Sequence, residues 1–269
     1  MEKNSIMMAT ETLLQIKDLS IQFGGLKAVD KVSFDIQRSE LLGLIGPNGA
    51  GKTTVFNIVS GFYQADSGSI FFENKDVSQL NAAKVNHRGM ARTFQNIRLF
   101  KSLTVIENVL MALQQKKHNG SFADWYHSVF NTKKHQEIEA ALKKEALELL
   151  DIFELSKDAD ELAGSLSYGS QRKLEIVRAL ATKPKLLMLD EPAAGMNHQE
   201  TQELNQLIRF IKDRFQLTIL LIEHDMKLVM NICDRIVVLN RGRKIADGLP
   251  KDIKCLPEVI EAYLGKKQV

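Results

Sequence analysis

Cysteines, long apolar runs and an excess of charge of one sign are scarce in this sequence. Its 269 residues include two cysteines, Cys233 and Cys255, and no CxxC pair, so we expect reduced thiols in a cytoplasmic protein. No stretch reaches the roughly eighteen consecutive apolar residues typical of a membrane-spanning helix. The formal net charge of +3 is not gathered into a basic tail and gives little support for nucleic-acid binding. The opening "MEKNSIMMAT" lacks the apolar core of a signal peptide, and we therefore expect a cytosolic chain that acts at a membrane only through a partner.

The order of the short apolar runs predicts an α/β domain with a helical block inserted into it. Between residues 96 and 183 the periodicity is helical, as in "LTVIENVLMAL" and "KKHQEIEAALKKEALELLDIFEL". Strand-like runs lie on both sides of this block: 13–23, 28–37, 41–46, 67–77 with a turn, 90–94, 185–190, 217–223 and 235–240. A helix is expected from Lys52 to about Ser60. Strands that alternate with helices predict a parallel sheet covered on both faces.

The strongest motif is "GPNGAGKTT", which begins directly after an apolar run and precedes the expected helix. It matches G-x-x-x-x-G-K-[ST] through Gly46, Gly51, Lys52 and Thr53. Glycines let such a loop curl so that successive backbone N–H groups point at phosphate oxygens. Lys52 would bring positive charge to the β- and γ-phosphates, and the Thr53 hydroxyl would bind Mg²⁺. The expected nucleotide-binding residues of this loop are Gly46, Pro47, Asn48, Gly49, Ala50, Gly51, Lys52, Thr53 and Thr54.

A pair of acids follows the buried strand predicted in "LLMLDEP". Asp190 stands at the carboxyl end of that strand, where open α/β sheets bind ligands, and its carboxylate suits Mg²⁺ held through a water shell. Glu191 is the expected general base, or the group that orients a water for attack on the γ-phosphate. Acids also cap strand ends for structural reasons alone, and the accompanying phosphate loop is what favours the catalytic interpretation.

A second small turn, "LSYGSQRK", opens an amphipathic helix. The apolar stripe of this helix is Leu174, Val177, Leu180 and Ala181, and the basic residues off that stripe are Arg172, Lys173 and Arg178. Ser167 and Gly169 lie at the start of the helix, where free N–H groups and the positive end of the dipole favour an anion. No lysine or metal-binding acid lies directly beside them, so this is a second and weaker phosphate cradle.

Together these motifs resemble the ATP-binding subunits of ABC transporters, over nearly the whole chain. "LSYGSQ" resembles the family signature, "ARTFQNIRLF" places Gln95 at the Q-loop glutamine, and "LLIEHDM" places His224 at the switch histidine. Phe23 lies where an aromatic residue of the family stacks on adenine. Alone, each of these three residues also fits a plain structural role as a polar loop residue, a histidine at a strand end or a core aromatic. Their occurrence in family order favours the functional interpretation.

The resemblance implies an ATPase that uses ATP and Mg²⁺. Catalytic roles are implied for Lys52, Glu191 and His224, and metal binding for Thr53, Gln95 and Asp190. In this family two nucleotide-binding subunits pack head to tail, and the residues matching Ser167 and Gly169 complete the site around the γ-phosphate held by the other subunit. ATP would thus close a dimer, and hydrolysis would release it.

The resemblance also implies the fold and its division. A single ABC ATPase domain of the α/β class is expected over 12–265, built on a P-loop NTPase core with an N-terminal antiparallel β subdomain. The core is expected over 12–95 and 184–250, an inserted α-helical subdomain over 96–183, and a C-terminal helix over 251–265. Implied partners are a second ABC ATPase, identical or related, integral membrane permease subunits and, indirectly, a periplasmic or extracellular substrate-binding protein, but no nucleic acid. The chain would lie at the cytoplasmic face of the plasma membrane.

Several segments resemble the ATPases of branched-chain amino-acid importers in particular: "FGGLKAVDKVSF", "ARTFQNIRLFKSLTVIENV", "EPAAGMN" and "VIEAYLG". The segment between Leu113 and Glu137 also fits that branch, either as a loop and helix that bury Trp125, Tyr126 and Phe130 or as a contact with membrane subunits. Urea importers and lipopolysaccharide exporters share much of the pattern. A soluble ABC ATPase acting on nucleic acid or ribosomes is a further alternative, which the single phosphate loop and the lack of heptads disfavour.

Two motifs depart from the commonest family pattern. The signature has Tyr168 and Ser170 where Gly and Gln are usual, although Ser167 and Gly169 are retained. In "AAGMN", Asn197 stands where many relatives carry Asp. An amide lacks the charge of that Asp, so we expect communication across the dimer to be tuned differently.

Overall fold

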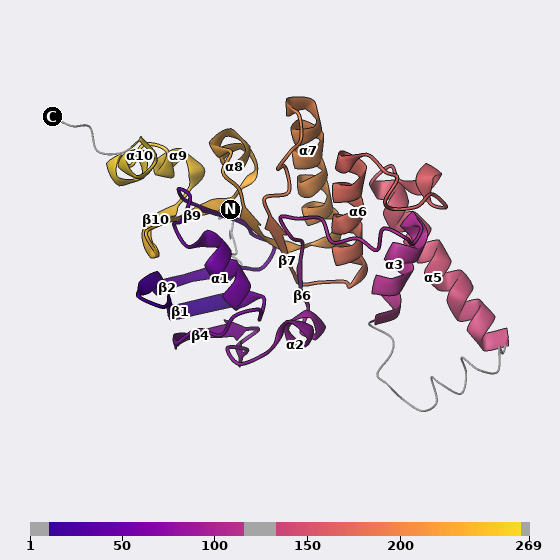
Figure 1. The fold of residues 1–269 in the computed structure, drawn as a ribbon, viewed down its shortest axis with the longest axis horizontal. Helices are drawn as coiled ribbons and strands as arrows, with labels where there is room; N and C mark the ends of the chain where they lie inside the picture. Colours follow the sequence, from indigo (N-terminus) through magenta and orange to yellow (C-terminus); the bar gives the residue numbers. More distant parts are fainter. Residues whose placement is uncertain (1–10, 116–132, 265–269) are drawn as a thin grey trace, which may run out of the picture. The chain divides into compact units, whose positions relative to one another are not determined.

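The chain divides into two compact units in the computed structural model, which describes residues 11–115 and 133–264. The first unit combines Met1–Ala82 with Lys212–Val269, and the second is Ala83–Ile211 (Figure 1). The division falls inside helix α7 (His198–Phe215). Within the described ranges, no helix combines the length and the apolar character needed to span a membrane.

An antiparallel sheet forms one part of the first unit. Its strands are β1 (Thr12–Phe23), β2 (Leu26–Gln37), β4 (Ser67–Phe72) and β5 (Lys75–Asp76), in the order β2-β1-β4-β5. β2 buries Val29, Val32, Phe34 and Ile36 and leaves the residues between them more exposed. This confirms the prediction of a half-buried antiparallel strand.

The other strands of the first unit form a group with β3 between β8 and β9. They are β3 (Leu41–Ile45), β8 (Thr218–Ile222), β9 (Arg235–Asn240) and β10 (Arg243–Gly248). β3 pairs in parallel with both β8 and β9, and every residue of β3 and β8 is buried, as continuous apolar runs predict. β10 is antiparallel to β9 and was not predicted, because "RKIADG" lacks a regular apolar alternation.

The helices of the first unit include one correction. α1 (Lys52–Val59) follows β3 as predicted, and α8 (Met226–Ile232) follows β8. The single C-terminal helix predicted over 251–265 is wrong, because this segment forms α9 (Pro250–Ile253) and α10 (Pro257–Leu264). Pro257 begins α10. Proline lacks the backbone N–H that a helix needs and disfavours helical geometry in the preceding residue, so one helix does not run through this position.

The second unit contains a parallel strand pair and packed helices. β6 (Met90–Arg92), which follows α2 (Ala82–His87), pairs in parallel with β7 (Leu186–Asp190). α3 (Val105–Gln115) packs against α5 (Lys133–Ile152) and α6 (Tyr168–Ala181), and the short 3-10 helix η1 (Ser156–Asp158) lies between α5 and α6 in the sequence (Figure 1). Fully buried side chains in this interior include Val105, Val109, Leu150, Leu174 and Val177. The predicted helical character of residues 96–183 is confirmed for 105–115, 133–152 and 168–181, whereas 96–104 and most of 153–167 form turns and loops between these helices.

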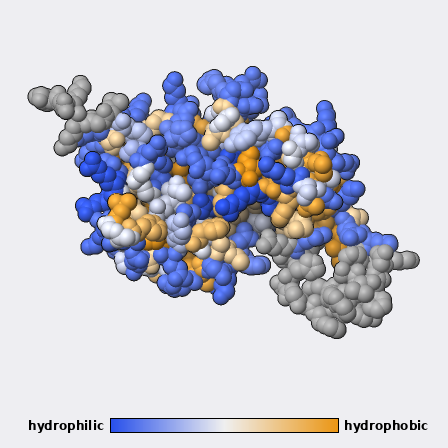
Figure 2. Space-filling model, viewed as in Figure 1, coloured by the Kyte–Doolittle hydropathy of each residue, from blue (hydrophilic) through white to orange (hydrophobic). Residues whose placement is uncertain are grey.

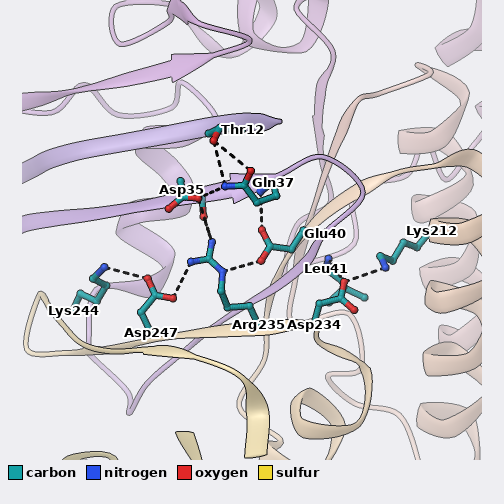
Figure 3. Close-up of polar contacts among 10 residues, drawn as sticks. All are labelled: Thr12, Asp35, Gln37, Glu40, Leu41, Lys212, Asp234, Arg235, Lys244 and Asp247. Atoms are coloured by element: carbon teal, nitrogen blue, oxygen red, sulfur yellow. Dashed lines mark hydrogen bonds and ion pairs between the residues drawn. The ribbon is translucent and has the colours of Figure 1, made fainter. Parts of the chain in front are cut away.

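A polar cluster around Arg235 connects the two sets of strands in the first unit (Figure 3). The Arg235 guanidinium donates to Glu40 Oε1 at 2.8 Å and to Asp247 Oδ1 at 2.9 Å, and it also donates to the backbone carbonyl of Asp35. Glu40 accepts a further hydrogen bond from the backbone N–H of Gln37 at 2.7 Å. Because Glu40 directly precedes β3, the cluster anchors the strand whose other end leads into the phosphate loop.

Hydrophobic side chains are not gathered into one large area on the face drawn in Figure 2, which is mostly hydrophilic with small separate orange patches. The exposed large hydrophobic side chains include Phe23 and Tyr63 in the first unit and Phe100 and Met111 in the second. Phe23 and Tyr63 contact each other in the candidate site of the first unit, and Phe100 and Met111 line a cavity in the second unit.

Candidate functional site

The phosphate loop between β3 and α1 leaves no room for a side chain at Gly46 or Gly51. Gly46 has φ 152° and Gly51 has φ 99°, in a region that other residues rarely adopt. A Cβ on Gly46 would lie 2.1 Å from the Leu239 carbonyl oxygen, and one on Gly51 would lie 2.6 Å from the Ala28 carbonyl oxygen. The loop therefore packs directly on neighbouring backbone, which fixes its curl.

Lys52, the first residue of α1, lies across this loop. Its ammonium group donates to the carbonyl oxygens of Gly46 at 2.7 Å and Pro47 at 3.1 Å, and the residue is 6% exposed. The lysine charge and the N–H groups that begin α1 are thus at the same end of the helix, an arrangement that favours an anion. The remaining loop residues differ in exposure: Ala50 is buried, Pro47 and Thr54 are half-buried, and Asn48, Gly49 and Thr53 are exposed.

The hydroxyl of Tyr263, on α10, lies close to the backbone N–H of Gly46. Burial raises the pKa of Tyr263 to about 12, and the Gly46 N–H opposes this rise. The C-terminal part of the chain therefore contacts the first residue of the phosphate loop. Sequence reasoning did not assign Tyr263 this position, because no local pattern links α10 to a loop more than two hundred residues earlier.

Phe23, the predicted adenine-stacking residue, ends β1 and is 46% exposed. Its ring meets the ring of Tyr63 edge to face, with centroids 5.5 Å apart and planes at 67°. Edge-to-face contact is a favourable geometry for aromatic pairs and restrains the orientation of both rings. The first unit thus presents an exposed, oriented aromatic surface as well as a phosphate loop.

His224 lies in the turn between β8 and α8, and its side chain is 61% exposed. The almost fully buried Glu223 carboxylate accepts a hydrogen bond from the His224 backbone N–H at 3.3 Å, and its Oε2 is 3.8 Å from His224 Nδ1. Asp225 caps α8 by accepting from the backbone N–H of Lys227 at 2.8 Å. These contacts fix the backbone from which the imidazole extends. A fixed backbone suits both interpretations of His224, as a structural histidine at a strand end and as the switch histidine.

In the second unit, Asp190 ends β7 and is 3% exposed. Its Oδ2 accepts a hydrogen bond from Arg92 Nη2 at 2.7 Å, and its backbone N–H donates to the Thr93 hydroxyl at 3.3 Å. The sequence analysis missed Arg92. A buried carboxylate requires a charge partner, so a basic residue on another predicted strand was the available signal.

Glu191 has a backbone φ of 47°, which is unusual for a residue other than glycine. Its Oε2 accepts a hydrogen bond from Gln95 Nε2 at 2.9 Å. The structure therefore brings together the predicted general base and the predicted Q-loop glutamine from distant parts of the sequence. Left-handed backbone at a non-glycine residue is a strained conformation of the kind that clusters at functional sites.

Ser167 and Gly169 lie at the start of α6, as predicted. The Ser167 hydroxyl accepts a hydrogen bond from the backbone N–H of Ser170 at 3.2 Å, so Ser167 is the N-cap of the helix. Gly169 is in the first turn, where an added Cβ would lie 3.5 Å from Glu200 Oε1. The assignment of these two residues to phosphate binding stays a prediction.

The loop that follows Glu191 contains the second departure from the family pattern. Asn197 caps α7 by accepting from the Glu200 backbone N–H at 3.0 Å, and Glu200 Oε2 accepts from the Asn197 N–H at 2.8 Å, which together form a capping box. Gly195 in this loop has φ 80°, and a Cβ there would lie 3.2 Å from the Tyr168 ring. The loop that leads to Asn197 therefore lies against the ring of Tyr168, so these two residues that depart from the family pattern belong to adjacent segments.

Arg172 is completely buried, although it lies off the apolar stripe of α6. Its guanidinium donates to Glu175 Oε2 at 2.8 Å and to the carbonyl oxygens of Phe94 at 2.6 Å and Gln95 at 2.8 Å. Burial raises the pKa of Glu175, and the Arg172 charge opposes that rise. α6 thus has a second buried face, which is polar and binds the segment that carries Gln95. The i,i+3 spacing of Arg172 and Glu175 was the one sequence signal for this pair.

A cavity of about 900 Å³ opens in the second unit beside the same segment. Three basic side chains, one acidic one and several apolar ones are among its lining residues: Arg92, Arg98, Arg178, Glu175, Phe94, Phe100 and Met111. Guanidinium groups lie over two of the rings, Arg98 at 4.0 Å from the Phe94 centroid and Arg178 at 4.9 Å from the Phe100 centroid. Trp125, Tyr126 and Phe130, the other candidates for a contact with membrane subunits, lie outside the described residues.

The donor types among the candidate residues suit magnesium. Mg²⁺ commonly keeps several waters and takes only one or two protein ligands together with substrate phosphates. The Thr53 hydroxyl in the first unit and the Asp190 carboxylate and Gln95 amide in the second are oxygen donors of this kind. Over residues 11–115 and 133–264, no group of three or more His, Cys, Asp or Glu side chains is arranged to hold a metal.

Comparisons with known proteins agree with the motifs. The family described as ABC transporter matches residues 29–194. The chain is 45% identical over 254 residues to the high-affinity branched-chain amino acid transport ATP-binding protein BraF of Pseudomonas aeruginosa, covering 94% of this chain and 98% of BraF. It is 44% identical over 257 residues to the corresponding protein LivG of Escherichia coli, covering 96% and 99%. The crystal structure of the ADP conformation of MJ1267, an ATP-binding cassette of an ABC transporter, matches with a TM-score of 0.80 and 34% identity over 96% of this chain and all of MJ1267.

The matched region includes the phosphate loop, Gln95, the signature turn and the acid pair, and the two curated relatives extend the match to nearly the whole length. The fold agrees as well, since an antiparallel β subdomain, a mixed sheet around the phosphate loop and packed helices are all present. This chain is therefore a member of the ABC transporter family and one of its ATP-binding proteins.

Proposed function

We propose that this chain is the ATP-hydrolysing subunit of an importer for branched-chain amino acids. The observation that carries this proposal is the 44–45% identity to BraF and LivG over almost the full length of each chain. Cargo recognition would lie in permease subunits and in a periplasmic or extracellular binding protein, since nothing in an ATPase fold specifies the cargo. The chain would act at the cytoplasmic face of the plasma membrane, with no nucleic-acid partner.

Nucleotide binding falls to residues of the first unit in this proposal. The loop of residues 46–54 holds the β- and γ-phosphates through the backbone N–H groups of its residues other than Pro47 and through the Lys52 ammonium, and Phe23 stacks on adenine. The buried, hydrogen-bonded position of Lys52 supports this role, because the loop already orients its charge. Binding exchanges the Gly46 and Pro47 carbonyl oxygens for phosphate oxygens as the acceptors of this ammonium group.

Hydrolysis falls to residues of the second unit together with His224. Glu191 takes a proton from the attacking water or orients it, and Gln95 holds the carboxylate through the 2.9 Å hydrogen bond. A bound Mg²⁺ would neutralise charge on the phosphates, with Thr53, Asp190 and Gln95 as its protein ligands. His224 contributes a hydrogen bond toward the γ-phosphate. All of these residues lie in the predicted core of 12–95 and 184–250, and the predicted helical subdomain of 96–183 carries the signature turn.

A second ATPase subunit completes each site in this proposal. Ser167 and Gly169 begin a capped helix but have no lysine of the phosphate-loop kind directly beside them, so they would bind the γ-phosphate held by another chain. Two nucleotides then close a head-to-tail dimer, identical or mixed, and hydrolysis opens it.

The cavity beside Gln95 is the proposed docking site for a permease subunit. Its arginines and exposed apolar side chains suit a short helix that carries an acidic residue among apolar ones. Met111→Asp would place a carboxylate at the rim of the cavity, with the same charge as the acidic residue of the permease helix. This variant should therefore fail to co-purify with the permease. Ile138→Asp, a similar change at an exposed position of α5 away from the cavity lining, is the matched control and should keep it.

Transport in proteoliposomes tests the proposed function directly. The chain would be assembled with the permease and binding-protein subunits of its transporter, and ATP-dependent uptake of leucine, isoleucine and valine would be compared with uptake of urea. Uptake of the amino acids, abolished by Lys52→Ala, is the expected result. ATP-driven uptake of urea but not of amino acids, or export of a lipid, would assign the chain to a different transporter.

A further inference from the structure

The pair Arg172 and Glu175 connects α6 to a single short segment of backbone. Arg172 donates to the carbonyl oxygens of Phe94 and Gln95 at 2.6 and 2.8 Å. Glu175 Oε1 accepts from the backbone N–H groups of Phe94 at 3.3 Å and Arg98 at 3.2 Å. The 2.8 Å ion pair between the two side chains connects these four hydrogen bonds into one network.

Stability alone does not explain a fully buried ion pair. Desolvation of two charges offsets most of their attraction, and apolar residues of similar volume usually stabilise a protein equally well. What the ionic pair adds is direction, because a planar guanidinium and a carboxylate bind carbonyl and N–H groups only in fixed positions. The pair is therefore suited to hold backbone 94–98 in one place on α6.

This segment of backbone carries the Gln95 side chain, whose amide donates to Glu191. The same helix begins with Ser167, the cap at the signature turn. A continuous series of short contacts thus leads from the signature turn through Arg172 and the Gln95 backbone to the carboxylate of Glu191. All of these residues belong to the second unit.

We propose that Arg172 and Glu175 are positioning residues that hold Gln95 against Glu191 and make the signature turn move together with this pair. This rests on the proposed function, in which the signature turn serves the nucleotide bound by the partner subunit while Gln95 and Glu191 serve the chain's own nucleotide. When the γ-phosphate bound by the partner subunit displaces the signature turn, the displacement is then transmitted to the attacking water at the chain's own nucleotide. The link lies within one chain and couples two sites.

A double-mutant cycle tests the positioning role. Arg172→Lys keeps the charge but loses the fork that binds both carbonyl oxygens, and Arg172→Met removes the charge; each is made with Gln95 and with Gln95→Ala. We expect Arg172→Lys to lower kcat about tenfold when Gln95 is present, with the Kd for ATP unchanged, because a displaced group of this kind slows chemistry without weakening binding. With Gln95→Ala, the further loss should be less than about twofold, since Arg172 then has no amide to position.

Lys173→Met is the matched control. Lys173 is the next residue of α6, and its Nζ lies 3.9 Å from Glu154, away from residues 94–98. This variant should leave kcat unchanged in both backgrounds. Glu175→Gln retains acceptors for the two N–H groups but weakens the hold on Arg172, and should give a smaller loss that also requires Gln95.

The outcomes separate this inference from the proposed function. Equal losses of kcat with and without Gln95 would show that Arg172 acts through stability alone and would overturn the inference, even with normal ATP turnover by the wild-type chain. Absence of wild-type ATP turnover in the assembled transporter would overturn both. If Arg172→Met does not fold, Arg172→Lys and Glu175→Gln still decide between the two results.

Discussion

Single residues of the phosphate loop are held by contact with neighbouring backbone, which gives two glycines different tolerances. Gly46→Ala would force a Cβ to 2.1 Å from the Leu239 carbonyl oxygen at φ 152°. We expect it to destabilise the protein by about 3 kcal/mol or more and to abolish ATP binding, because backbone rather than a flexible side chain must shift. Urea unfolding and nucleotide binding measure the two effects.

Gly49→Ala is the matched control for this substitution. Gly49 also has positive φ, 77°, but an added Cβ would meet nothing within 4 Å. Its cost should be about 1–2 kcal/mol, the strain of the backbone conformation alone. Equal stability of the two alanine variants would contradict the close approach of Gly46 to Leu239.

The acid after β7 allows the sharpest test of chemistry at the residue scale. Glu191→Gln should lower kcat about 10²–10⁴-fold, because the amide does not accept a proton, while the Kd for ATP stays the same. The amide oxygen still accepts from Gln95, so the loop around residue 191 should keep its conformation. Phosphate release measures turnover, and size-exclusion chromatography with ATP should detect a trapped dimer. Normal hydrolysis by this variant would remove Glu191 from the catalytic residues.

At the scale of elements, the cap of α7 separates a structural role of Asn197 from a functional one. Asn197→Ala removes the acceptor for the Glu200 N–H and should cost about 1 kcal/mol in unfolding free energy. Asn197→Asp keeps this acceptor and adds a negative charge at the helix N-terminus. This variant should therefore be as stable as the wild type or more stable by about 0.3–1 kcal/mol. Thermal unfolding measures both. A destabilised Asp variant would mean that the amide nitrogen, and not the oxygen, matters at this position.

The burial of the Tyr263 hydroxyl, on α10, predicts a dependence of stability on alkaline pH. The pKa of Tyr263 is raised from 10.0 to about 12 by burial, so the folded protein holds this proton more tightly than the unfolded chain. The resulting stabilisation is complete below pH 10 and is lost as the pH rises through about 12. The free energy of unfolding should therefore fall more steeply over this range for the wild type than for Tyr263→Phe, as measured by urea unfolding at each pH. If the free energy of unfolding falls equally with pH in the two proteins, the Tyr263 hydroxyl is exposed to water in the folded state.

Elements with a local signal were predictable from the sequence, and contacts between distant segments were not. Continuous apolar runs gave β3 and β8, and the glycine pattern between β3 and α1 gave the phosphate loop, because burial on both faces and phosphate binding each demand particular residue types nearby. β10 lacks such a pattern, whereas Pro257 is itself a local signal that one helix does not run through 251–265. The pairing of Arg172 with the backbone of Gln95, and of Arg92 with Asp190, depends on how segments meet in space, which single charged residues do not encode.

At the scale of the whole molecule, the proposed function divides one catalytic site between two chains. A symmetric dimer repeats each interface residue on both sides, so variants in different halves of the site complement each other in a mixed dimer. Lys52→Ala disables the phosphate loop, and Ser167→Arg fills the signature turn with a bulky charge. Each variant alone should form dimers without an intact site and should hydrolyse no ATP.

Mixing the two variants tests whether the site is shared. In a dimer with one chain of each kind, the intact phosphate loop of the Ser167→Arg chain faces the intact signature turn of the Lys52→Ala chain, and the other site carries both defects. Equal mixing makes half of the dimers mixed, each with one working site, so ATPase activity should recover to roughly a quarter of the wild-type value. Phosphate release before and after mixing, with subunit exchange followed by differently tagged chains, measures the recovery. If exchange is complete and no activity returns, Ser167 and Lys52 do not meet across an interface, and the signature turn must act within its own chain.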